Sequence, residues 1–175
     1  IAARTIAKRN YNACAGEAFV AGLLHDIGKA ILKQYVQADF REIMRRVAGG
    51  ECGLDEAEKN VIGTSHGEVG GWLAARWNLP NMITDAIRFH HEPGEARVDP
   101  RFVAIVSLAN HLCHLSSIGD SGRKVLREPD PEVWSSLEQL PVPVAADDIE
   151  ALQGDFLLEF DRSETFISFI HEEAG

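Results

Sequence analysis

Apolar residues recur at helical spacing along most of this chain, and no segment of convincing length alternates between apolar and polar residues. Spacing of three and four residues is typical of helices that bury one face, whereas half-buried strands alternate at every residue. The 175 residues are enough for one domain with a sizeable core. The sequence therefore predicts an all-α bundle, with helices over 2–8, 17–35, 39–48, 54–62, 66–77, 81–89, 100–116, 132–140, 147–160 and 163–173.

Local signals fix some of the expected boundaries. Ser65 and Glu68 have the spacing of a capping box, so a helix should begin at His66. Gly28 lies inside the expected helix 17–35, and glycine weakens a helix interior. We therefore expect a bend or a close helix contact at Gly28.

Two sets of large side chains are expected in the core. The first is the apolar stripe of the expected helix 100–116, formed by Phe102, Ile105, Ala109 and Leu112. The second is the pair of indoles at Trp72 and Trp77. Turn-forming residues are frequent between positions 118 and 131, so this segment is expected to contain turns.

The net charge of −10 argues against a nucleic-acid partner, because an acidic surface repels phosphates. One basic cluster, formed by Arg41, Arg45 and Arg46, also contains Asp39 and Glu42. This mixture is typical of a solvated helix face, and we expect no nucleic-acid binding there.

No apolar run is long enough to span a bilayer, and the chain does not open with a basic segment followed by an apolar one. The three cysteines are far apart and form no CxxC pair. This argues against a disulfide framework and against a thiolate zinc site. We therefore expect a cytoplasmic protein without a membrane partner.

Four of the seven histidines stand at informative positions. His25 is followed by Asp26, His66 should begin a helix, and His90 and His91 should end one. Imidazole and carboxylate groups together ligate divalent ions, and two such ions activate water against a phosphoester. Equally, the same side chains would form a buried polar network that fixes the core, without any metal.

The sequence around these histidines resembles a known family. Residues 18–29, AFVAGLLHDIGK, resemble the central motif of the HD superfamily. The segments IGTSH at 62–66, WNLP at 77–80, AIRFHHEP at 86–93 and IVSLANHL at 105–112 continue the similarity. Over roughly residues 2–115 the chain resembles an HDOD domain, the HD-related output domain of bacterial signalling proteins.

The resemblance implies an HD-like multi-helix bundle over 1–120, with a small C-terminal helical extension over 121–175 packed on it. In catalytic HD enzymes an earlier histidine, the His-Asp doublet and a later aspartate bind metal. Here His25 and Asp26 match the doublet, but residues 1–8 contain no histidine. The later aspartate aligns with Asn110, whose neutral amide is a weaker ligand for a hard cation.

The HD-GYP phosphodiesterases share histidines like His66, His90 and His91, and a lysine like Lys29 near the substrate phosphate. Their GYP segment is absent from this chain. The resemblance thus gives candidate ligands for a divalent ion, which would be Fe, Mn, Ni or Mg, and candidate ligand-binding groups at Lys29 and Asn110. The candidate metal ligands are His25, Asp26, His66, His90 and His91.

Two functions follow from this pattern. The first is a non-catalytic regulatory domain that acts through protein contacts with a receiver, sensor or output module. That module would lie N-terminal to Ile1, because a chain that begins without Met is expected to be a fragment. The alternative is a metal-dependent phosphohydrolase. Since the earlier histidine has no match and Asn110 replaces an aspartate, we assign no catalytic residue.

Overall fold

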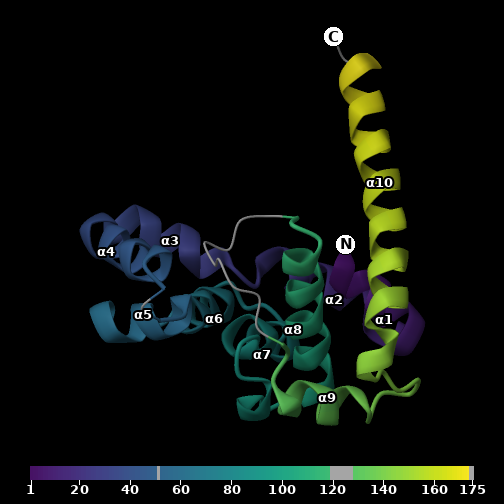
Figure 1. Ribbon diagram of the computed structural model, residues 1–175, viewed down its shortest axis with the longest axis horizontal. Helices are drawn as coiled ribbons and strands as arrows, with labels where there is room; N and C mark the ends of the chain where they lie inside the picture. The colour runs from purple at the N-terminus through teal and green to yellow at the C-terminus, as the bar shows by residue number, and fades with distance from the viewer. Residues whose placement is uncertain (51, 119–127, 174–175) are drawn as a thin grey trace.

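The computed structural model describes residues 1–50, 52–118 and 128–173, and every regular element within these ranges is helical (Figure 1). This confirms the expected all-α fold. The α-helices are α1 (Ala2–Asn10), α2 (Ala15–Leu24), α3 (Ile27–Tyr35), α4 (Gln37–Ala48), α5 (Leu54–Ile62), α6 (His66–Arg76), α7 (Asn81–Phe89), α8 (Pro100–Leu115), α9 (Pro131–Leu137) and α10 (Ile149–Glu173). Short 3-10 turns lie at Asn12–Cys14, Pro93–Glu95 and Ala146–Asp148.

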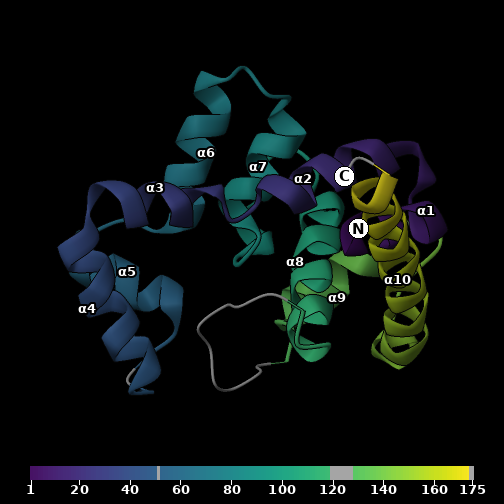
Figure 2. The same cartoon turned by 90° about the horizontal axis from the view of Figure 1, so that it is seen from above.

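Helix α8 forms the centre of the core. It packs against α1, α2, α7 and α9, and Figure 2 shows it between α7 and α10. Because it has neighbours on several sides, α8 buries far more than one stripe. Its buried residues are Phe102, Val103, Ala104, Ile105, Val106, Leu108, Ala109 and Leu112, which include the whole predicted stripe. Full burial of one such large side chain stabilises the fold by roughly 1.5–3 kcal/mol.

Helices α3, α4 and α5 form an arm at one side of this core (Figure 2). The arm has its own small apolar cluster, which consists of Ile43, Val47, Leu54 and Ala57. Helix α3 connects the arm to the rest of the fold because it packs on α6 as well as on α4. The chain then returns through α5 to the start of α6.

The expected helix 17–35 is divided into two helices, whereas the sequence predicts only a bend or a close contact at Gly28. Helix α2 ends at Leu24 and α3 begins at Ile27, so His25 and Asp26 form the junction. The predicted close contact at Gly28 is present. A Cβ atom at this position would collide with the backbone carbonyl of His66. Helices α3 and α6 therefore pack more closely here than a residue with a side chain would allow.

The prediction that Trp72 and Trp77 belong to the core is wrong, since their exposed fractions are 57% and 52%. Helix α6 turns its glycines inward instead. Added Cβ atoms at Gly67 and Gly71 would meet Arg88 of α7, and one at Gly70 would meet Ile87 of the same helix. Because the glycine face makes the close packing, the indole of Trp72 is left outside.

The C-terminal region contains one long helix where two were expected. Helix α10 runs without a break through residues 161–163. Arg162 pairs with Glu159 at 2.9 Å, and Ser163 Oγ donates to the Glu159 carbonyl at 2.8 Å.

The first half of α10 packs on α1, where Leu152 and Phe156 are buried and Arg9 pairs with Asp155 at 3.0 Å. The expected turn-rich segment 118–131 falls mostly outside the described residues, and the division of the chain at residue 120 stays a prediction. Among the helices of the described ranges, none is both long and apolar enough to cross a bilayer.

The contact at Gly28 leads to a stability prediction. We expect Gly28→Ala to lower the free energy of unfolding by about 1–3 kcal/mol, because the methyl group must displace the His66 backbone. The matched control is Gly154→Ala in α10, where the structure leaves open space. This control should raise the stability by up to about 1 kcal/mol. Denaturant unfolding measures both, and equal effects of the two variants would contradict the contact.

Candidate metal centre

The ends of four helices bring the candidate residues together. His25 and Asp26 form the junction between α2 and α3, His66 begins α6, and His90 and His91 follow the last residue of α7. Asp26 Oδ1 lies 3.4 Å from His66 Nε2 and 3.6 Å from His90 Nε2. His91 Nε2 lies 3.1 Å from His66 Nε2. Adjacent side chains of a continuous helix point in different directions, whereas a junction between two helices allows them to approach the same site.

The imidazole rings of the centre are oriented through their Nδ1 atoms. His90 Nδ1 donates to the Ile87 carbonyl at 2.9 Å, and His66 Nδ1 donates to Glu58 Oε2 at 2.6 Å. These acceptors place the proton on Nδ1, so the Nε2 atom of each neutral ring carries a lone pair. Burial lowers the pKa of His66, which keeps this ring neutral at pH 7.

Glu58 belongs to this cluster of side chains, and the sequence analysis missed it. Its fully buried carboxylate accepts from both the backbone N–H and the ring Nδ1 of His66, at 2.8 and 2.6 Å. A carboxylate behind a histidine typically orients that histidine toward a metal. The available signal was a charged residue beside Ala57 on the buried face of α5.

Asp26 Oδ1 is buried and has no hydrogen-bond donor within the part of the chain that the structure describes. Its nearest neighbours are the Nε2 atoms of His66 and His90, which are acceptors because the Nδ1 atoms of these rings carry the donated protons. Leaving such an oxygen unsatisfied costs about 1–3 kcal/mol. Acceptors that converge in this way are stabilised by a cation between them.

The Asp26 carboxylate is negatively charged at neutral pH, as a ligand for a cation must be. Burial alone would raise its pKa, but the neighbouring His90 and His25 rings and the ammonium of Lys29 outweigh this effect and hold the pKa of Asp26 below its usual range. Lys29 Nζ donates to Asp26 Oδ2 at 2.7 Å. One carboxylate oxygen is therefore paired with Lys29, and the other faces the imidazoles.

The donor set fits one divalent transition-metal ion. Asp26, His66, His90 and His91 each offer one ligand atom, and these atoms lie within 4.8 Å of one another. Three imidazole nitrogens and one carboxylate oxygen are ligands typical of Fe, Ni or Zn, whereas Mg²⁺ prefers oxygen ligands. Of the ions expected from the sequence, Mg therefore fits these residues least.

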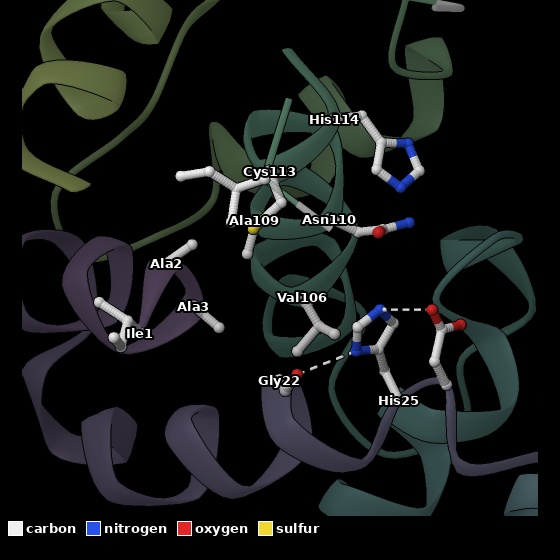
Figure 3. Close-up of a pocket in the computed structure, with 12 residues that line it drawn as sticks. Ile1, Ala2, Ala3, Gly22, His25, Val106, Ala109, Asn110, Cys113 and His114 are labelled. Atoms are coloured by element: carbon white, nitrogen blue, oxygen red, sulfur yellow. Dashed lines mark hydrogen bonds and ion pairs between the residues drawn. The ribbon is translucent and has the colours of Figure 1, made fainter. Parts of the chain in front are cut away.

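His25 lies beside this group rather than within it. Its Nδ1 donates to the Gly22 carbonyl at 2.9 Å, and its Nε2 lies 3.4 Å from Asp26 Oδ2 (Figure 3). Burial and the neighbouring His90 lower the pKa of His25 to about 4. The ring is thus neutral at pH 7, and it faces a cavity that Asn110 also lines.

The other two candidate residues have different surroundings. The Lys29 ammonium is paired with the Asp26 carboxylate at 2.7 Å. Asn110 lies on α8, and its side chain makes no hydrogen bond to a histidine among the residues described. The structure therefore places Asn110 with the cavity and Lys29 with the metal centre.

The chain resembles known proteins in both sequence and structure. The family model of the HDOD domain matches residues 1–93. A crystal structure of an HDOD domain protein with unknown function from Geobacter sulfurreducens superimposes with a TM-score of 0.69. It is 28% identical, and the alignment covers 94% of this chain and 56% of that chain.

An uncharacterized protein of Treponema pallidum (strain Nichols) is 26% identical over 95 residues. That alignment covers 54% of this chain and 18% of the relative. The chain thus spans little more than half of one of these proteins and less than a fifth of the other.

The role of Glu58 is testable. Glu58→Ala leaves two donors of His66 buried without an acceptor, so we expect a loss of about 2–4 kcal/mol in unfolding free energy. Glu58→Gln keeps an acceptor oxygen and should lose less. Glu56→Ala, on the exposed side of the same helix, is the control and should change stability by less than about 0.5 kcal/mol. A Glu58→Ala variant as stable as this control would show that the carboxylate does not support His66.

Proposed function

Since this chain belongs to the HDOD domain family, we propose that it is a regulatory domain of a longer signalling protein, which acts through protein contacts and holds one divalent metal ion at Asp26. The observation that carries the metal part is the buried Asp26 Oδ1, which faces imidazole nitrogens and has no donor in the described structure. The ion would supply positive charge at this point and join the ends of three helices.

The absence of catalysis is the second part of the proposal. Activation of water between two ions requires a second set of ligands. On the far side of Asp26 the chain offers His25 and the amide of Asn110, and helix α1 contains no histidine. Asp26 Oδ2, the remaining carboxylate oxygen, is paired with Lys29. A second ion would therefore lack the negative charge that its binding needs.

Regulation through protein contacts is supported by the surface of α6. Trp72 and Trp77 are more than half exposed, and Trp is enriched at protein interfaces. Both relatives are also much longer than this chain, which fits a domain that works beside others. The acidic charge and the widely spaced cysteines support a cytoplasmic location without a nucleic-acid partner.

Metal analysis tests the first part. We expect the purified protein to bind about one equivalent of Fe, Ni or Zn, and a chelator to lower its melting temperature. An ion at one hundred times its dissociation constant stabilises the fold by about 2.7 kcal/mol. Asp26→Ala should lose the ion and become insensitive to chelator, whereas Asp39→Ala on the exposed face of α4 should behave like wild type. If chelator has no effect while Asp26→Ala still destabilises, the centre is a metal-free polar network.

Hydrolysis assays test the second part. The metal-loaded domain should not turn over cyclic di-GMP, nucleoside monophosphates or a chromogenic phosphodiester in the presence of Mn, Fe or Ni, because the second ligand set is incomplete. The controls are the buffer with metal alone and a variant that combines His25→Ala with Asp26→Ala. Turnover well above the buffer rate that this variant abolishes would instead establish a phosphohydrolase.

A further inference from the structure

A cavity of about 200 Å³ lies beside the metal centre, where α1, α2 and α8 meet (Figure 3). His25 and Asn110 contribute polar groups to its wall, and Val106 and Ala109 contribute apolar ones. An apolar cavity of about 150 Å³ in a protein core is large enough for benzene. The present cavity therefore has room for a molecule of one or two rings.

His25 presents an unsatisfied acceptor at this cavity. Its Nδ1 donates to the Gly22 carbonyl, which leaves Nε2 as the acceptor of the ring. This Nε2 is buried and makes no hydrogen bond among the groups that the structure describes, and Asp26 Oδ2, itself an acceptor, lies 3.4 Å away. A ligand N–H would satisfy it.

Asn110 adds a second and complementary group. Its carboxamide offers a donor and an acceptor side by side, and Figure 3 shows it above His25, on the same side of α8. Asparagine pairs through both atoms with the adjacent donor and acceptor of an adenine edge. The cavity wall therefore suits a ligand that has an adjacent donor and acceptor on one edge, for Asn110, and a separate N–H, for His25.

The charge of the wall restricts the ligand further. The described residues that line the cavity include no lysine and no arginine, and Asp26 contributes a carboxylate. Burial raises the pKa of Cys113, so this thiol stays uncharged. A phosphate or carboxylate would enter such a cavity without a side-chain cation to compensate it, and an uncharged ligand is favoured.

We propose that this cavity binds a small uncharged heterocycle of the nucleobase class, which donates an N–H to His25 Nε2 and pairs with the Asn110 carboxamide. The site goes beyond the proposed regulatory function and does not require the metal ion. It gives the HDOD domain a small-molecule site next to its metal centre, and Asp26 contributes to both.

Calorimetry and thermal shift with adenine, hypoxanthine and uracil test the proposal, on both chelator-treated and metal-loaded protein. At least one free base should bind in both states. Asn110→Leu and His25→Phe should each weaken binding at least tenfold, which corresponds to about 1.4 kcal/mol. Ser107→Leu is the matched control, since Ser107 lies on α8 outside the cavity wall, and it should bind like wild type.

Asn110→Asp keeps the shape of the side chain but removes its N–H donor, so it should also weaken binding if the larger changes disturb folding. Binding of toluene with no binding of the bases would overturn the proposal in favour of an apolar void. Tighter binding of adenosine monophosphate than of adenine would overturn the charge argument. A lack of base binding in well-folded protein that still binds metal would refute this site alone, whereas base binding without metal binding would refute only the metal centre.

Discussion

The carboxylate of Asp26 joins the parts of this fold. One oxygen faces the imidazoles of His66 and His90, and the other accepts from Lys29. The packing of α3, α6 and α7 leaves Oδ1 buried without a donor, and such an oxygen is costly unless a donor or a positive charge reaches it. The close approach of Gly28 to the His66 backbone makes this arrangement possible.

Much of the fold follows from the sequence because helical periodicity is a local property. The stripe of α8 and the capping box of Ser65 are read directly from residue spacing, and both are present in the structure. The break at His25 is different. Gly28 indicates a close contact, but the surrounding segment favours helix, and the place where the helix is interrupted is not contained in the local pattern.

The candidate site was predictable only in part, for a related reason. The histidines and Asp26 were found through a motif, but Glu58 has no motif and acts through a contact eight positions along the chain. Hydrophobicity alone predicts that Trp72 is buried in the core, and this prediction is wrong. In α6 the buried face is the one that allows the closest approach of backbones, and it consists of three glycines together with His66 and Ala74.

The way in which the centre is assembled from helix ends affects how the chain reaches its folded state. His66 and His90 are 24 positions apart, and Asp26 comes from a still earlier junction, so an unfolded chain has no preformed cluster. Ion capture at such a site can only follow the docking of the helices that carry it. An ion at the proposed centre would therefore stabilise only the state in which α3, α6 and α7 are already docked.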